Sequence, residues 1–270
     1  MKKKVHISKL FSSGYLVLVL LFVYLPIVYL ILFSFNEGKS MTNFSGFSLR
    51  WYESMFKDRT MLESIYVTLF VAVISTVVST VVGTVAAIGL SKARRIIRSI
   101  VLEVNNLPVL NPDIVTAIGL MLLFMSVRVQ TGMITLILSH ISFCTPFVIL
   151  SVMPKLRQLD DNVAEAALDL GATPWKALTK VISPQISPAI LSGALIAFSM
   201  SLDDFVVSYF NAGPGINTIS MYVYSMKRYN LSVNAMATLF VVIVALTLIL
   251  ANVVPMIKDK KAQKEEPRNA

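Results

Sequence analysis

The stretch Asp160–Pro188, DDNVAEAALDLGATPWKALTKVISPQISP, decides how the rest of the chain is organised. It lies between two long apolar segments, yet it is too polar to cross a bilayer, and its pattern predicts two short helices. Asp160 or Asp161 can cap the first helix, and Gly171 supplies the left-handed residue that stops it. This helix has one apolar face at the i, i+3, i+4, i+7 spacing, formed by Val163, Ala166, Ala167 and Leu170.

The second half of the stretch begins with Thr173 and Pro174, an N-cap and first-turn pair that starts another helix. Its apolar face is formed by Trp175, Leu178 and Ile182. Pro184 and Pro188 are expected to end it. A capped hairpin between membrane spans has two interpretations: another protein docks on it, or it packs on its own chain. These residues fit both.

The composition excludes a soluble protein of this length. Of the 270 residues, 56% are hydrophobic and 14% are charged, and several apolar runs exceed the ~18 residues that mark a membrane span. The runs are continuous rather than alternating, which disfavours a membrane β-barrel. The single cysteine and the two histidines exclude cysteine-based metal sites and histidine clusters. We expect an all-α, polytopic membrane protein that forms one transmembrane domain over residues 1–270.

Six transmembrane helices are expected, at about residues 14–35, 65–90, 100–126, 133–153, 187–210 and 236–257. The lysines before the first run suggest a signal peptide, but the run exceeds 20 residues and no small-residue cleavage site follows it. We therefore interpret it as an uncleaved span. In the second span a small residue recurs at every fourth position, which predicts close packing of a neighbouring helix. These residues are Ser75, Ser79, Gly83 and Ala87.

The positive charges indicate the orientation of the spans. If the N-terminus is cytoplasmic, the inside segments hold 17 of the 24 lysines and arginines, and the outside segments hold 7. This asymmetry follows the positive-inside rule, so both termini and the loop at residues 154–186 are expected to be cytoplasmic. It also accounts for the net charge of +9 without a nucleic-acid partner.

Three carboxylates lie within the predicted spans, those of Asp113, Asp203 and Asp204. A carboxylate at the centre of a span costs about 2.5–3.5 kcal/mol on insertion scales. No lysine or arginine lies in the body of the third, fourth or fifth span. The acids could be protonated, pair with a cation from a partner chain, or bind a cationic substrate; helix packing or kink capping is the structural alternative. We expect all three to line one cavity that opens outward. Asp203 and Asp204 would point about 100° apart on a helix, so one can face the cavity while the other caps a break.

Asparagine and proline beside Asp113 predict that the third span is broken at Asn111–Asp113, as in the discontinuous helices of transport sites. Aromatic ring faces attract ammonium groups, so the aromatic residues expected near the outer side are candidates for substrate contact: Trp51, Tyr209 and Tyr222, with Tyr224 and Tyr229 beside them. Their expected position near the outer side also fits ordinary anchoring at the membrane interface.

The sequence contains no motif for an energy source or a catalytic centre. It has no G-x-x-x-x-G-K-[ST] loop, no G-x-S-x-G elbow and no H-E-x-x-H. A membrane enzyme that uses Asp113 and Asp203 would need the two acids to face each other. His140 is expected to make hydrogen bonds between helices, and Cys144 is expected to lie in the core. We therefore expect a non-catalytic chain without cofactor or metal, which works as one part of a larger machine.

The hairpin resembles the EAA loop of bacterial ABC importer permeases, whose pattern is EAA-x3-G-x9-I-x-L-P. Here Glu165-Ala166-Ala167 is followed after three residues by Gly171, and after nine more by Val181-Ile182-Ser183-Pro184. Val and Ser at 181 and 183 depart from the pattern at the helix end. Five further segments resemble the PotC-type spermidine/putrescine permeases: LPIVYLILFSFN (25–36), FSLRWYESMF (47–56), NPDIVTAIGLMLLF (111–124), SHISFCTPFVIL (139–150) and SLDDFVVSYF (201–210).

This resemblance implies the type I importer (MetI-like) fold and a place in the bacterial plasma (inner) membrane. It implies a permease for spermidine and putrescine, with another cationic solute or ferric iron as the alternative. The implied partners are a PotA-like ATPase dimer that binds ATP and Mg, a PotB-like second permease and a PotD-like external polyamine-binding protein. The coupling contact with the ATPase would fall on Glu165, Ala166, Ala167, Gly171, Trp175 and Pro184.

Overall fold

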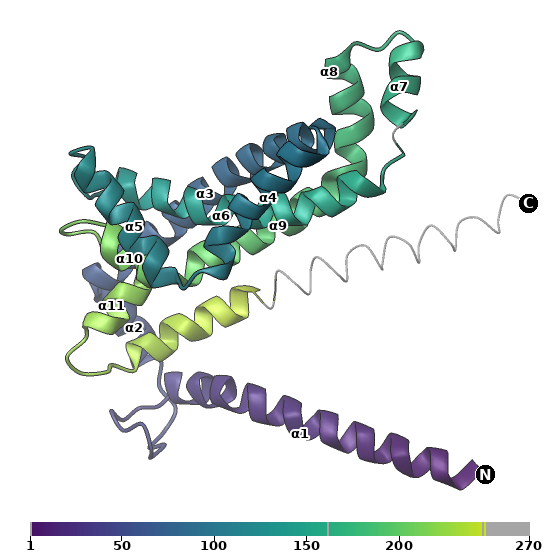
Figure 1. The fold of residues 1–270 in the computed structure, drawn as a ribbon. Helices are drawn as coiled ribbons and strands as arrows, with labels where there is room; N and C mark the ends of the chain where they lie inside the picture. Colours follow the sequence, from purple (N-terminus) through teal and green to yellow (C-terminus); the bar gives the residue numbers. More distant parts are fainter. Residues whose placement is uncertain (1, 161, 245, 247–270) are drawn as a thin grey trace, which may run out of the picture. The chain divides into compact units, whose positions relative to one another are not determined.

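The computed structural model describes residues 2–160, 162–244 and 246, and this part of the chain is helical apart from loops and one isolated bridge between Asn36 and Phe47 (Figure 1). It divides into two compact units. One unit contains the described residues up to Arg59 together with those from Met226 onward, and the other is Thr60–Ser225.

The first unit contains three helices: α1 (Lys2–Ser34), α2 (Arg50–Lys57) and the apolar helix Ser232–Val244. Its core is formed by Phe33, Trp51, Leu231 and Ala235, all buried. The indole N–H of Trp51 donates a hydrogen bond of 2.7 Å to the carbonyl of Asn36. The buried amide of Asn36 in turn donates to the carbonyls of Ser40 and Asn43, at 2.9 and 3.0 Å, and so organises the loop after α1.

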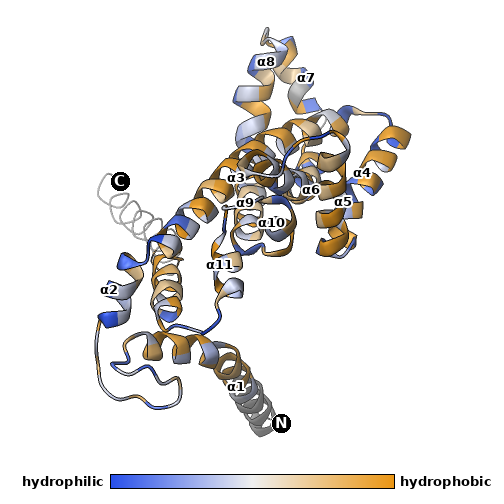
Figure 2. Ribbon diagram, turned by 90° about the vertical axis from the view of Figure 1, so that its left-hand side faces the viewer, coloured by the Kyte–Doolittle hydropathy of each residue, from blue (hydrophilic) through white to orange (hydrophobic). Residues whose placement is uncertain are grey.

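The second unit contains the elements that build the site. In chain order they are α3 (Arg59–Lys92), whose first residue belongs to the other unit, α4 (Arg95–Leu110), α5 (Asp113–Ser126), α6 (Met133–Gln158), α7 (Asn162–Asp169), α8 (Pro174–Ala177), the π-helical turn η1 (Leu178–Ile182), α9 (Ser183–Asp203), α10 (Val206–Asn211) and α11 (Ile219–Ser225). Figure 2 shows hydrophobic residues along much of α3 and α9. Many of these side chains are exposed in the chain alone, which suits a lipid-facing surface.

Helix α6 is the centre of this unit and packs against α3 and α9 through small residues. The predicted small-residue ridge of α3 is confirmed, because its four residues are buried. At Gly83 the approach is so close that a Cβ atom would lie 2.8 Å from the Cβ of Val148 on α6. At Gly193 of α9 a Cβ atom would lie 3.2 Å from the backbone of the same valine. Cys144 is fully buried, as predicted, and its thiol lies 3.4 Å from the Ala197 carbonyl.

Four described helices are long and apolar enough to cross a membrane: Gly14–Ser34, Arg59–Lys92, Met133–Gln158 and Pro174–Asp203. A fifth span is formed if α4 and α5 count together, and these two helices meet at an angle of 107°. The predicted break of the third span is therefore confirmed. The expected sixth span at 236–257 lies largely outside the described residues; the described part of it belongs to Ser232–Val244.

The expected end of the second hairpin helix at Pro184 and Pro188 is wrong. The helix continues from Pro174 through α8, η1 and α9 to Asp203. It therefore ends before residue 210, where the predicted fifth span was expected to end. The π-helical turn just before Pro184 changes the hydrogen-bond register, since the N–H of Ser183 donates to the carbonyl of Leu178. Pro188 cannot donate to the carbonyl of Pro184, and the hydroxyl of Ser187 donates to that carbonyl at 2.9 Å.

Candidate functional site

A cavity of about 390 Å³ lies where the break between α4 and α5 meets α6, the end of α9 and the start of α10. Asp113, Asp203 and Asp204 all line it, together with Thr116 and mainly apolar side chains. The prediction that the three carboxylates share one cavity is therefore confirmed. Within the described residues, no group of three or more His, Cys, Asp or Glu side chains has a geometry that could hold a metal ion.

The end of α9 explains why two adjacent aspartates reach the same cavity. The expectation that they point about 100° apart on one helix is wrong, because α9 ends at Asp203 and Asp204 has an extended backbone, with φ −61° and ψ 132°. The carboxylate of Asp204 accepts the N–H groups of Val207 at 3.2 Å and Ser208 at 2.7 Å. Asp204 therefore caps the start of α10, as the sequence allowed for one of the pair.

Asp113 lies at the break between α4 and α5. It is the first residue of α5, directly after Pro112, rather than a residue in the middle of a continuous span. The carboxylate thus lies at the N-terminal end of a helix, where the macrodipole favours negative charge. In the described ranges of the chain, neither Asp113 nor Asp203 makes a hydrogen bond or ion pair through its side chain, and both residues are exposed. These two are the carboxylates open to a ligand.

His140 of α6 connects the helices that form the cavity wall. Its ring is almost fully buried, with Nδ1 2.7 Å from the hydroxyl of Ser201 on α9 and Nε2 3.1 Å from the hydroxyl of Ser208 on α10. The same Nε2 lies 3.6 Å from a carboxylate oxygen of Asp204. The predicted role of His140 as a hydrogen-bonding residue between helices is confirmed. Sequence reasoning missed the two serines, which lie on different helices on either side of the break at Asp204.

Two of the aromatic residues that the sequence suggested, Tyr209 and Tyr224, lie near the cavity, and Phe205 joins them. Phe205 lines the cavity, and its ring centroid lies 5.5 Å from that of Tyr209 and 4.8 Å from that of Tyr224. Tyr209 is therefore next to the cavity without lining it. Tyr224 of α11 belongs to this cluster, and Tyr222 on the same helix does not line the cavity. Trp51 is buried in the core of the other unit, where it serves packing.

The predicted hairpin forms helices α7 and α8, which lie side by side (Figure 1). Gly171 in the turn has a φ of +83°, and the hydroxyl of Thr173 accepts the N–H of Lys176 at 3.3 Å. Both caps are thus as expected. Leu170 and Trp175 are 90% and 72% exposed. These large apolar side chains are not covered by the described chain, so the hairpin has an exposed apolar surface.

The other residues expected to take part in coupling lie on this hairpin and at the start of α9. Glu165 and Ala166 are exposed on α7, while Ala167 is partly covered. Pro184 is exposed in the first turn of α9, directly after η1. The arrangement places the EAA residues and the exposed tryptophan on one short hairpin.

Comparisons with known proteins identify the family of the chain. The profile of the family described as "Binding-protein-dependent transport system inner membrane component" matches residues 79–261. The chain is 37% identical over 227 residues to the putrescine transport system permease protein PotI of Escherichia coli (strain K12), covering 81% of each chain. It is 34% identical over 256 residues to the spermidine/putrescine transport system permease protein PotC of the same strain, covering 94% of this chain and 97% of the relative.

A solved structure with a similar fold belongs to a bacterial ABC transporter involved in the import of the acidic polysaccharide alginate. It superposes with a TM-score of 0.73 at 17% identity and covers 94% of this chain and 97% of its own. At that identity the likeness shows the fold alone. The family profile, together with relatives above 30% identity over most of their length, decides the membership. The chain belongs to the family of binding-protein-dependent transport system inner membrane components.

Proposed function

We propose that this chain is the substrate-translocating permease of an ATP-driven importer for polyamines such as spermidine and putrescine. The relatives PotI and PotC carry these substrates in their names and support that choice. One observation carries the proposal: a single helical segment, Pro174–Asp203, begins in the exposed hairpin and ends at the carboxylate cavity. Docking and substrate contact are therefore at the two ends of one element.

The cavity suits a flexible organic cation. Asp113 and Asp203 offer two carboxylates without a protein partner in the described chain, and Phe205 adds an aromatic ring face for an ammonium group. Asp204 is engaged in capping α10, so we assign it to holding the cavity wall. Two open carboxylates attract a polyamine without enclosing it, and a transport site must release what it binds.

The hairpin supplies the coupling. We infer that Leu170 and Trp175 seat in a PotA-like ATPase, which binds the ATP and Mg that this chain has no motif to bind. Thirty residues of helix at ~1.5 Å each span roughly 45 Å, enough to carry a displacement of the hairpin to the cavity. Closing of the ATPase dimer then shifts the population between inward-open and outward-open states.

The proposal places this chain in a complex at the inner membrane. A PotB-like second permease completes the pathway, and a PotD-like external protein delivers the polyamine. Both termini and the hairpin face the cytoplasm, in keeping with the distribution of lysine and arginine. The relatives are transport permeases, which supports a non-catalytic role for the chain.

The test is uptake of labelled spermidine by the assembled complex carrying Asp113→Asn together with Asp203→Asn. Loss of two attractive charges at the cavity is expected to reduce uptake at subsaturating substrate by about tenfold or more, since 1.4 kcal/mol corresponds to a factor of ten. Glu103→Gln is the matched control, because Glu103 is an exposed carboxylate of α4 that does not line the cavity. Equal uptake by the double variant and the control would refute the role of the two acids. Uptake of another cation, or of ferric iron, in place of polyamines would redirect the substrate assignment.

A further inference from the structure

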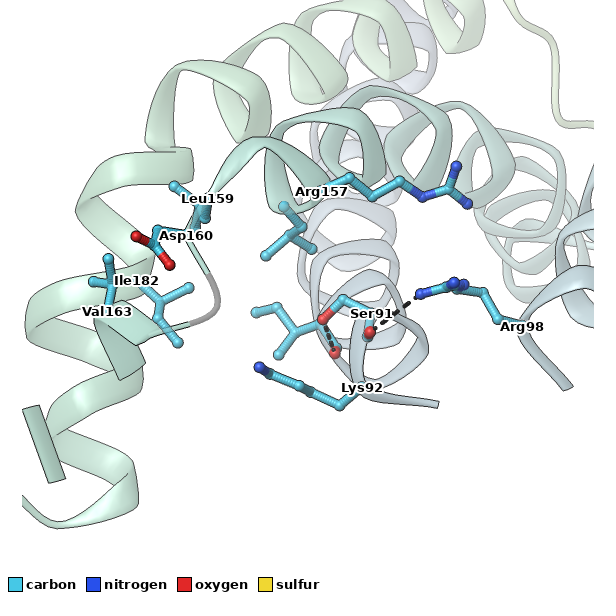
Figure 3. Close-up of a pocket in the computed structure, with 10 residues that line it drawn as sticks. Ser91, Lys92, Arg98, Arg157, Leu159, Asp160, Val163 and Ile182 are labelled. Atoms are coloured by element: carbon cyan, nitrogen blue, oxygen red, sulfur yellow. Dashed lines mark hydrogen bonds between the residues drawn. The ribbon is translucent and has the colours of Figure 1, made fainter. Parts of the chain in front are cut away.

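A second cavity, of about 250 Å³, lies at the opposite end of the unit, between the ends of α3 and α6, the start of α4 and the base of the hairpin (Figure 3). Its polar lining contains three cations and one carboxylate, from Lys92, Arg98, Arg157 and Asp160. The rest of the lining is mostly aliphatic. Neither the proposed transport site nor the exposed docking face of the hairpin uses these residues.

The two arginines keep most of their hydrogen-bonding capacity. Arg98 is half-buried and its Nη1 is 3.4 Å from the carbonyl of Ser91, a long contact that leaves the other donors of the guanidinium available. Arg157 makes no hydrogen bond or ion pair within the described chain. The carboxylate of Asp160 accepts the N–H of Asn162 at 3.0 Å and lies beyond ion-pair distance from both arginines. Within the described chain, Arg98 and Arg157 therefore line the cavity without a carboxylate partner.

An exposed apolar surface lies beside the arginines of this cavity. On the first turns of α4, next to Arg98, the side chains of Ile96, Ile97 and Ile100 are 74%, 52% and 59% exposed. The base of the hairpin closes the cavity on another side through Val163 and Ile182. A ligand that matches this lining has a phosphate for the two guanidinium groups and hydrocarbon that continues over the isoleucines.

We propose that the cavity binds the phosphodiester headgroup of an anionic phospholipid, with Arg98 and Arg157 as its ligands. Guanidinium groups bind phosphate oxygens through paired hydrogen bonds, and basic pockets between membrane helices on the cytoplasmic side suit anionic headgroups. The bound headgroup bridges α4 and α6 beside the base of the coupling hairpin. The hairpin is then held in register with the span helices only in a membrane that contains anionic lipid.

The experiment measures the affinity of the purified full-length chain, in nanodiscs of zwitterionic lipid, for added phosphatidylglycerol. The variant carries Arg98→Gln and Arg157→Gln. The control carries Arg94→Gln and Arg95→Gln, which remove the same charge from the same region but do not line the cavity. The variant with both cavity arginines replaced is expected to bind phosphatidylglycerol about tenfold or more weakly than the unsubstituted chain. The control variant is expected to lose less than about threefold in affinity.

Each other outcome overturns the proposal. An equal loss in both variants indicates diffuse attraction by a basic surface. Stabilisation by millimolar inorganic phosphate to the same degree as by the lipid indicates a free anion as the ligand. Unchanged lipid binding with lost ATPase assembly indicates an acidic protein segment instead. If the double variant fails to fold, Arg157→Gln alone decides, because this exposed side chain has no polar partner in the described chain whose loss could unfold it.

Discussion

Replacing His140 with alanine removes a side chain of α6 that hydrogen-bonds to both α9 and α10 behind the carboxylate cavity. Two hydrogen bonds are lost, to Ser201 and Ser208, and each such bond between membrane helices contributes about 0.6–1.7 kcal/mol. The empty volume left by a fully buried imidazole adds roughly 1–2 kcal/mol. We expect the free energy of unfolding to fall by about 2–5 kcal/mol.

The assay is the thermal unfolding of the purified full-length chain, read from the loss of helical circular dichroism. At roughly 2–4 °C per kcal/mol for a chain of this size, the alanine variant is expected to unfold about 4–20 °C below the unsubstituted chain. Asparagine at position 140 can replace the Nδ1 contact and glutamine the Nε2 contact, so both are expected to recover part of the loss. Cys144→Ala, one helical turn away and equally buried, is the control for ordinary core truncation and is expected to lose less.

The hydrogen bonds of His140 also predict how the same variants change uptake. Because His140 lies 3.6 Å from the capping carboxylate of Asp204, its loss also weakens the α9–α10 corner, so uptake is expected to fall in the order of the unfolding temperatures. An alanine variant that unfolds within about 2 °C of the unsubstituted chain would refute the reasoning. So would asparagine and glutamine variants no more stable than alanine, since volume alone would then explain the loss.

Two glycines give further predictions with controls in the same chain. Gly83→Val is expected to destabilise the chain by about 1–3 kcal/mol, because a Cβ atom there would lie 2.8 Å from Val148, whereas Gly89→Ala on the same helix meets nothing within 4 Å and should be neutral or stabilising in the same unfolding assay. Gly171→Ala is expected to strain the backbone at φ +83° by about 1 kcal/mol, and Gly215→Ala is expected to strain the backbone at φ +78° by the same amount. At both positions the added Cβ atom would have no other atom within 4 Å, so the two variants differ only in their place in the fold. If the hairpin transmits the ATPase motion, only the variant at 171 reduces uptake; equal losses would contradict that role.

Local signals in the sequence predicted the hairpin well. A threonine hydroxyl three residues before the N–H it accepts, and a glycine where the backbone must be left-handed, act within one turn of chain, so they need no knowledge of the rest of the fold. The small-residue ridge of α3 was predictable for a similar reason, because its period is that of the helix itself. These features depend on neighbours in sequence.

Features that depend on neighbours in space were not predictable in the same way. Trp51 has the residue type of an interface anchor, but its burial follows from packing against Phe33 and Leu231, which are distant in sequence. The aromatic cluster at Phe205 includes Tyr224 of α11, nineteen residues further along the chain. No single-sequence pattern fixes such contacts, because tertiary packing decides them.

The prolines of the hairpin show how a correct local rule gave a wrong element. A proline removes one donor and usually ends a helix, so Pro184 and Pro188 predicted a stop. The chain instead places a π-helical turn before the first and the hydroxyl of Ser187 on the carbonyl that the second leaves free. The continuous helix Pro174–Asp203 links two predictions that nothing in the sequence connected. A docking hairpin and a pair of open carboxylates could have been independent parts of the chain. Because one helix joins the hairpin to Asp203, a displacement of the hairpin either moves Asp203 at the cavity or is absorbed by bending at the π turn.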